Sequence, residues 1–242
     1  MWRHFLLAQL MAAFLMIAGT AILAAAIFIA APRLMPVRVL VLETPLHRVT
    51  PGDLREALRG RARGSFLTLP LADMRASLES LPWVRRASAR RVWPDKISLL
   101  LEEQQIAARW GNSGREWVNA EGDVFAANLP RAGQALPPDL PRFSGPPGSS
   151  ARLLARYAES KRLLAPIGLT PRALTLSARL ALDVELSNGM RLKLGQEDAL
   201  EISIARRIRR FAAAYARFVA PRQPPPASVD LRYPNGFALS PY

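Results

Sequence analysis

The feature that most constrains this chain is a run near its N-terminus, from Phe5 to Ala31, that contains no charged side chain. A helix made of these 27 residues would be about 40 Å long. The hydrocarbon core of a bilayer is about 30 Å thick, and about 20 helical residues cross it. The run therefore predicts a transmembrane helix over residues 5–31, preceded by a cytoplasmic tail of residues 1–4.

A cleaved signal peptide is the alternative interpretation of this run, because Ala24, Ala25 and Ala26 resemble a cleavage site. The apolar part of a signal peptide is only about 7–15 residues long, so the length of the run favours an uncleaved anchor. Basic residues lie on both sides of it, with Arg33 and Arg38 following, so local charge does not decide the orientation. The short leading tail and the large trailing part favour a single-pass type II protein with its bulk outside the cytoplasm.

The composition of the chain limits its chemistry. It has no cysteine, which excludes disulfide bonds, thiolate metal sites and a cysteine nucleophile. Its 33 Lys and Arg residues outnumber its 19 Asp and Glu residues, for a net charge of +14. Such a surface suits anionic lipid headgroups or acidic protein partners, with nucleic acid as the competing ligand. The excess of arginine over lysine also fits the codon bias of a GC-rich genome, and this alternative stays open.

No group of residues in the sequence is typical of an active site. Apart from His4, the only histidine is His47, which lies in a predicted loop. Neither a Gly-x-Ser-x-Gly elbow nor a phosphate-binding glycine pattern occurs. Glu102 and Glu103 are neighbours on a predicted strand, so their side chains point to opposite faces and cannot flank one substrate. The sequence therefore predicts a protein that is not an enzyme and has no cofactor or metal.

The first part of the trailing chain predicts a small α+β domain over residues 36–104. Its β-branched residues 37–42 favour a strand. Thr50 can cap a helix that has Pro51 at its first position and stops near Gly60. This domain is therefore expected to begin with a strand followed by a helix.

A second helix is predicted after Pro70, because apolar residues recur there at helical spacing, and Pro82 ends it. Strands are predicted next over residues 86–92 and 96–102, the second with its apolar residues on one face. Two helices would then cover one face of a three-stranded sheet. The residues expected to meet there are Leu71, Met74, Leu78, Leu81, Ile97, Leu99 and Leu101.

Residues 105–242 predict a second domain, made of strands and two helices. Short strands are expected within residues 105–129, and the proline-rich residues 130–148 predict a surface connection. Asn188-Gly189 is a strong hairpin signal. The strands on either side of it are expected over residues 180–186 and 190–194.

The two helices of this domain are predicted over residues 150–165 and 198–220. A last strand is predicted from Val229 to Leu239. In the longer helix the apolar stripe consists of Leu200, Ile204, Ile208, Phe211, Tyr215 and Phe218, and the arginines mainly off it are Arg206, Arg207, Arg209, Arg210 and Arg217. These arginines predict a solvated face, with lipid headgroups or acidic partner segments as the alternative.

Seven short segments occur in a specific order along the chain. They are residues 81–84 (Leu-Pro-Trp-Val), 90–94 (Arg-Arg-Val-Trp-Pro), 108–110, 118–119, 122–125, 145–148 (Gly-Pro-Pro-Gly) and 229–238 (Val-Asp-Leu-Arg-Tyr-Pro-Asn-Gly-Phe-Ala). Together, behind an apolar N-terminal run, they resemble the FtsQ/DivIB family of bacterial cell division proteins. The fold expected from pattern and resemblance is α+β: an N-terminal transmembrane helix, a POTRA-type domain (β-α-α-β-β) and a mixed β domain with two helices.

The resemblance implies an inner-membrane protein with its POTRA domain and β domain in the periplasm, enriched at the division septum. It implies a non-catalytic scaffold of the divisome that binds the single-pass proteins FtsB and FtsL and helps recruit and control septal peptidoglycan synthesis. Other divisome proteins would be bound through the POTRA domain. The alternative, from a different class, is a periplasmic POTRA-bearing chaperone or export factor.

The last predicted strand is expected to be the partner site, because an exposed sheet edge can accept an extended partner segment as a further strand. Arg232 would supply a charge-assisted donor and Tyr233 an amphipathic aromatic anchor. Gly236 would either let the partner backbone approach or occupy a turn that needs positive φ. Pattern and resemblance together predict that the partner contacts Arg232, Tyr233, Asn235, Gly236, Phe237 and Ala238.

Overall fold

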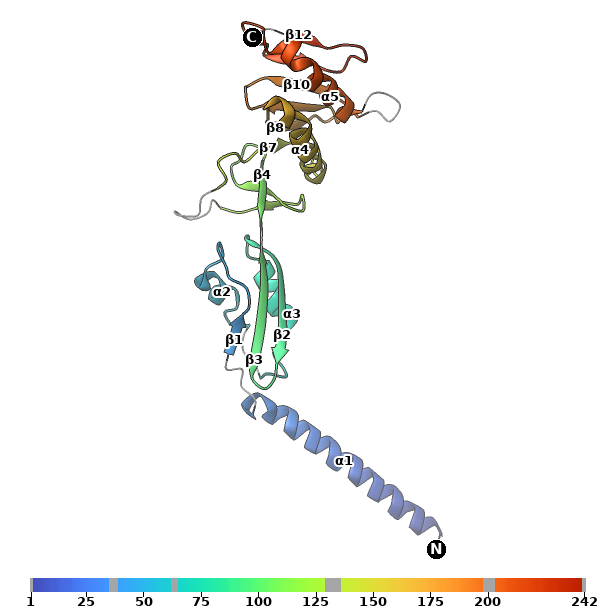
Figure 1. Cartoon of the computed structure of the whole chain (residues 1–242). Coiled ribbons are helices and arrows are strands. Elements are labelled where there is room, and N and C mark those ends of the chain that lie inside the picture. The colour runs from blue at the N-terminus through green and yellow to red at the C-terminus, as the bar shows by residue number, and fades with distance from the viewer. Residues whose placement is uncertain (1, 35–38, 62–64, 129–135, 198–202, 241–242) are drawn as a thin grey trace. The chain divides into compact units, whose positions relative to one another are not determined.

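The structure, a computed structural model, describes residues 2–34, 39–61, 65–128, 136–197 and 203–240 (Figure 1). The chain divides into two compact units, residues 1–103 and residues 104–242. Each unit has its own sheet and its own cluster of buried apolar residues.

The first helix, α1, spans Trp2–Leu34. The side chains described within it are those of residue 9 and residues 11–27. In the part of the chain that the structure describes, no helix is both long and apolar enough to cross a membrane. The transmembrane helix predicted over residues 5–31 therefore gains no support from the structure and stays a prediction.

The remainder of the first unit is a three-stranded sheet with two helices. The strand β1 (Val39–Leu42) pairs in parallel with β3 (Lys96–Glu103), and β3 pairs antiparallel with β2 (Val84–Val92). The helices α2 (Pro51–Ala57) and α3 (Leu71–Glu79) lie between β1 and β2 in sequence. The predicted order of strand, helix, helix, strand and strand is confirmed.

The start of α2 follows from local chemistry. The Thr50 hydroxyl oxygen accepts a hydrogen bond from the Asp53 N–H at 3.2 Å, and the Asp53 carboxylate accepts one from the Thr50 N–H at 2.9 Å. This reciprocal capping satisfies donors that the helix itself leaves without a partner. Pro51, which has no N–H, occupies the first turn as predicted.

The helix α3 packs its apolar face on the sheet, and Met74 and Leu78 are fully buried there. Leu71 and Leu81 are only partly buried at the border of the same cluster. The predicted meeting of this helix with one face of β3 is confirmed. The strand residues in the cluster are Ile97, Leu99 and Leu101.

The second unit is built on one mixed sheet of nine described strands in the order β12-β11-β10-β9-β8-β7-β4-β5-β6 (Figure 1). Helices α4 (Ser150–Leu164) and α5 (Ile204–Ala214) share one buried core with the sheet. The strands are β4 (Ile106–Trp110), β5 (Glu116–Asn119), β6 (Val124–Ala126), β7 (Arg142–Ser144), β8 (Pro171–Leu176), β9 (Leu182–Leu186), β10 (Arg191–Gly195), β11 (Ser228–Asp230) and β12 (Ala238–Ser240).

The end of α5 departs from the predicted stripe. A π-helical turn, Tyr215–Val219, follows α5. A π turn holds more residues than an α turn, and here Val219 is buried while Phe218 is exposed. Residues 198–202 of the predicted helix, with Leu200, lie outside the described residues.

Three strand predictions are corrected. The short β7 lies inside the stretch expected to be a surface connection, and β8 lies where no strand was expected. The last predicted strand, Val229 to Leu239, is wrong as a single element. It consists of β11 and β12, paired antiparallel around a loop over residues 231–237. The sequence Pro234-Asn235-Gly236 has the turn residues that interrupt a strand.

Candidate functional site

The candidate partner site is the chain end formed by β11, the loop and β12. β12 is the edge strand of the nine-stranded sheet, because its one described neighbour is β11. The two strands pair Ser228 with Ser240, Val229 with Leu239 and Asp230 with Ala238. Beyond β12 no further described strand continues the sheet, so one of its sides can pair with another chain.

Buried apolar side chains fix both ends of this segment. Val229 and Leu231 are fully buried at its start, and the half-buried Phe237 and Leu239 pack against the same core at its end. The residues between these anchors are exposed at Arg232, Tyr233, Pro234 and Asn235. The loop therefore presents its side chains outward while its two ends are held by the core.

Arg210 of α5 holds the backbone of the loop. Its Nη2 donates hydrogen bonds to the carbonyl oxygens of Leu231 at 3.2 Å, Tyr233 at 2.6 Å and Gly236 at 3.0 Å. Its Nη1 donates to the carbonyl oxygen of Pro234. Burial lowers the pKa of this guanidinium from its ordinary value, and neighbouring arginines lower it further. One side chain thus joins four carbonyls of the loop to the helix.

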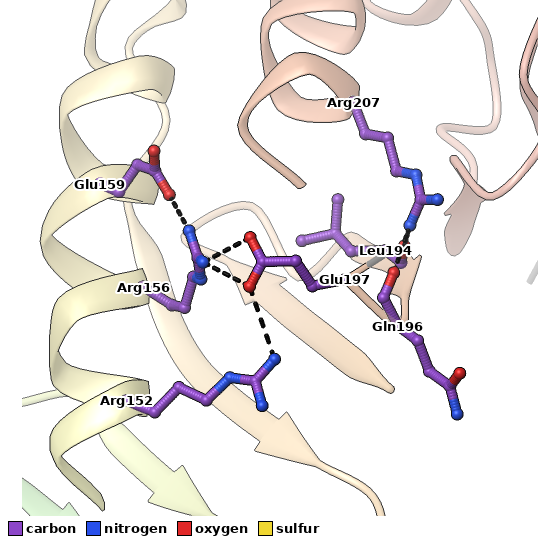
Figure 2. A network of polar contacts seen from close by, with 7 residues as sticks. All are labelled: Arg152, Arg156, Glu159, Leu194, Gln196, Glu197 and Arg207. Atoms are coloured by element: carbon purple, nitrogen blue, oxygen red, sulfur yellow. Dashed lines mark hydrogen bonds and ion pairs between the residues drawn. The ribbon is translucent and has the colours of Figure 1, made fainter. Parts of the chain in front are cut away.

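A second arginine on α5 fixes the strand beside β11. Arg207 is 5% exposed, and its Nη1 donates to the carbonyl oxygens of Leu194 at 2.5 Å and Gln196 at 2.8 Å (Figure 2). Bonds from a charged donor to carbonyls are strong when water is excluded. The end of β10 is therefore fastened to α5 by a buried cation.

The residues that follow β10 are also held to α4 by ion pairs. Glu197 accepts hydrogen bonds from Arg156 at 2.5 Å and from Arg152 at 3.5 Å, and Arg156 also donates to Glu159 at 2.5 Å (Figure 2). The arginines point from α4 toward Glu197, which follows β10. Side chains from both helices therefore hold the residues that follow β10.

Arg232 is engaged within the chain. Its Nε donates to both carboxylate oxygens of Asp230, at 2.9 and 3.0 Å, and its Nη2 donates at 2.5 Å. These hydrogen bonds from Arg232 lower the pKa of the Asp230 carboxyl below its ordinary value. The Arg232 side chain is still 60% exposed. It lines a hollow of about 620 Å³ together with Arg179 and Arg207.

The predicted site residues, which are neighbours in the sequence, lie on the loop and at the start of β12. Tyr233, the predicted anchor, is 55% exposed. Gly236 does not have positive φ, which excludes one of its two predicted roles. A Cβ built on Gly236 meets nothing within 4 Å, so a side chain there would point into open space. Asn235 and Ala238 are exposed, whereas Phe237 is half-buried and packs against the core.

The groups considered as catalytic candidates have structural partners. Glu103 accepts hydrogen bonds from the backbone N–H groups of His47, Arg48 and Val49, which ties the end of β3 to the loop before α2. Glu102 pairs instead with Arg85 at 2.7 Å. Among the described residues, no group of three or more His, Cys, Asp or Glu side chains is placed to hold a metal ion.

The sequence interpretation missed Arg207 and Arg210, which it assigned to a solvated face. A signal was present in their spacing. The two residues lie three apart, as neighbours on a helix do, and they alternate with the buried Ile204, Ile208 and Phe211. Arginines interleaved with an apolar stripe can donate to buried carbonyls, but the sequence does not show where those carbonyls are.

Comparison with known proteins identifies the family. The model "POTRA domain, FtsQ-type" matches residues 35–104, and the model "Cell division protein FtsQ/DivIB, C-terminal" matches residues 108–232. Cell division protein FtsQ of Bordetella pertussis is 37% identical over 209 residues, covering 82% of this chain and 75% of the relative. FtsQ of Burkholderia pseudomallei is 39% identical over 193 residues, with 80% and 74% covered. FtsQ of Shewanella oneidensis is 36% identical over 206 residues, with 85% and 74% covered. The chain belongs to the FtsQ/DivIB family of cell division proteins.

Proposed function

We propose that this chain is a non-catalytic scaffold of the bacterial divisome that binds an extended segment of an FtsB-like partner as a further strand on β12. The observation that carries the proposal is the position of β12 at the edge of the described sheet, next to a loop that Arg210 fastens. An FtsL-like protein would join through the same complex. This scaffold would help recruit and control septal peptidoglycan synthesis.

Strand addition fits the chemistry of β12. The strand is only three residues long, and its Ala238 and Ser240 are exposed while Leu239 packs on the core. Short edge strands resist uncontrolled pairing between sheets. A partner segment that pairs here gains main-chain hydrogen bonds, and side-chain contacts supply the specificity. The binding would then depend on the shape of the edge more than on most single side chains.

The fastened loop supports tight binding by lowering its entropic cost. A loop that must be ordered on binding loses affinity, because each immobilised group has a free-energy cost. Here the carbonyl groups of Tyr233 and Gly236 are already held by Arg210. Tyr233 can therefore offer its exposed ring to a partner without ordering the backbone that carries it.

The charge around Arg232, at the start of the loop, suits an acidic partner segment. Arg232 and Arg179 line the same hollow, with Glu197 as its acidic member. One edge of the Arg232 guanidinium is occupied by Asp230, so we propose that its exposed part meets the partner carboxylate. Complementary charges of this kind raise the association rate and are weakened by salt.

The membrane anchor is part of the proposal and rests on the uncharged sequence of residues 5–31. It would place the POTRA domain and the β domain in the periplasm, with the POTRA domain available to other divisome proteins. N-terminal sequencing of the mature protein tests the anchor. Retention of the first residues supports it, and a start near Ile27 would contradict it.

Titration of the full chain in detergent with the periplasmic segment of its FtsB-like partner tests the binding site. Gly236→Ala should bind normally, because a Cβ at this position meets no atom of the chain itself. Gly236→Trp should abolish binding, because its large side chain would obstruct the approach of the partner backbone. Tyr233→Ala should weaken binding by about 2 kcal/mol or more, which is roughly 30-fold. Unchanged affinity in Gly236→Trp, Tyr233→Ala and Arg232→Ala would show that the partner binds elsewhere.

The cellular role has its own test. A fluorescent fusion of the chain should form a ring at mid-cell in dividing bacteria. A uniform signal around the envelope would favour the chaperone or export factor over the divisome scaffold.

A further inference from the structure

The end of the β2–β3 hairpin exposes a tryptophan. Trp93 is 75% exposed, whereas Trp117 is buried and Trp83 and Trp110 are partly buried. A tryptophan has a large apolar body and one N–H donor, which suits the boundary between an apolar phase and water. Among the described residues, Trp93 makes no side-chain hydrogen bond, ring contact or cation–π contact at the tip of the hairpin.

The surroundings of Trp93 continue the apolar surface. Lys96, the first residue of β3, pairs in register with Val92 of β2 and with Val39 of β1. Val92 is 37% exposed and Val39 is 41% exposed, and Lys96 between them is exposed as well. Paired residues point to the same face of a sheet. We call Val39, Val92, Trp93 and Lys96 the hairpin end.

The hairpin end is also positively charged. Residues 90–96 carry three basic side chains and one acidic side chain, Asp95. Arg90 is neutralised by Glu43 at 2.7 Å. Arg91, which pairs with the buried Ile97 and so lies on the opposite face of β2 from Val92, donates hydrogen bonds to carbonyl oxygens of the chain, among them those of Phe66 and Leu69. Lys96 makes no ion pair with any described residue. The exposed Val92 and Trp93 thus lie beside the cation of Lys96.

The chain enters the POTRA domain at this same end of the sheet. β1 begins at Val39, beside the first residue of β3, so its start and the hairpin end lie together (Figure 1). Helix α1 ends at Leu34. Consecutive Cα atoms are about 3.8 Å apart, so the five steps from Leu34 to Val39 span about 19 Å at most. If α1 is the proposed anchor, Val39 cannot lie far from the membrane surface.

We propose that the hairpin end binds the surface of an anionic lipid bilayer, with Trp93 in the headgroup region and with Lys96 on lipid phosphates. This inference rests on the proposed anchor. Tryptophan is enriched at membrane interfaces, a lysine can keep its amine on a headgroup while its stem lies along apolar neighbours, and basic residues are attracted to anionic leaflets. The contact would set the orientation of the POTRA domain relative to the membrane.

A membrane fits these observations better than a protein partner does. The hairpin end is a turn with an exposed tryptophan, whereas aromatic hot spots in protein complexes sit in well-packed pockets. Its position close to the end of α1 along the chain also favours the bilayer that α1 would enter. Burial of the tip by a protein and not by lipid is therefore the competing outcome of the test.

The absence of cysteine makes the test direct, because a single introduced thiol can be labelled. The full chain in nanodiscs would carry an environment-sensitive fluorophore at Val92→Cys. The matched control is Leu100→Cys, which is 50% exposed on β3 four residues beyond Lys96. That separation is about 13 Å along a strand. Ile17→Cys, in α1, reports on the anchor itself.

The label at residue 92 should shift to the blue and be quenched by nitroxide lipids, more strongly with phosphatidylglycerol than with phosphatidylcholine. The label at Leu100→Cys should remain in water, and Trp93→Ser should return the residue-92 label to water. The proposal is overturned if the residue-92 label stays in water, or if Trp93→Ser leaves its emission and quenching unchanged. So does burial that appears only when another protein is added. An Ile17→Cys label outside lipid would contradict the anchor, which separates the two failures.

Discussion

We expect Arg210 to order the loop of the partner site before the partner binds. Arg210→Ala removes hydrogen bonds to the carbonyl oxygens of Leu231, Pro234, Tyr233 and Gly236. A hydrogen bond from a charged donor contributes about 1.5–3 kcal/mol. The loop carbonyls lie near the surface and can bond to water once the arginine is gone, so the loss should amount to about one such bond and not four. Partner affinity should then fall by about 10- to 150-fold.

The neighbouring arginine provides the control. Arg209 is exposed on the same helix, so Arg209→Ala changes the net charge equally without releasing the loop. Arg210→Lys should give an intermediate affinity, because an ammonium group offers its donors from one point and cannot reproduce the spread of a guanidinium. Isothermal titration of each full-length variant with the partner segment gives the comparison. Equal affinities in Arg210→Ala and Arg209→Ala would refute the reasoning.

Three further predictions concern stability. Leu78→Ala empties a fully buried site and should lower the free energy of unfolding of the first unit by about 2–5 kcal/mol; a change below about 1 kcal/mol in urea melts would show that the site collapses. Gly122 has φ +93° and a Cβ there would lie 2.6 Å from the Cα of Ala151, so Gly122→Ala should cost about 2 kcal/mol or more. Gly114→Ala, with φ +67° but nothing within 4 Å, should lower the melting temperature less, and equal losses would rule out the clash. The pKa of Asp230 is lowered in the folded chain by its arginine partner, so its stabilisation is present above the ordinary aspartate pKa and is lost as pH falls through the lowered value. The stability difference between the wild type and Asp230→Asn should therefore shrink below about pH 4, and a difference that is constant from neutral to acid pH would contradict this.

The POTRA domain was predicted well because its local signals agree with its packing. Thr50 and Pro51 mark a helix start chemically, and the structure shows the expected capping. The spacing of Met74 and Leu78 defines one buried face, and the alternation after Lys96 defines another. Each of these signals lies within a few residues, so the sequence carries it directly.

The strands that were missed depend on distant pairing. β7 has three residues within a proline-rich stretch, and it exists because β4 and β8 flank it in parallel. Alternation cannot be recognised over three residues. The split of the last strand into β11 and β12 was missed for a different reason, since the turn residues Pro234 and Asn235 were present but were outweighed by the apolar positions on either side.

The residues predicted to contact the partner stay a prediction, and the residues that support them were missed. The structure shows that Arg232 and Tyr233 are exposed. The supports come from other elements, since Arg210 lies on α5 and Glu197 follows β10. Contacts between residues far apart in the chain follow from the fold, which local patterns do not specify.

Hydrogen exchange at single amides of β12 tests the central claim most directly. The full chain in nanodiscs would be followed with and without the periplasmic segment of its FtsB-like partner. If the partner adds a strand, the amides within Ala238–Ser240 that point away from β11 should become protected on binding, and those of β6, the opposite edge of the same sheet, should not change. Partner binding that leaves the amides of β12 as exposed as before, or that protects β6 instead, would contradict the account.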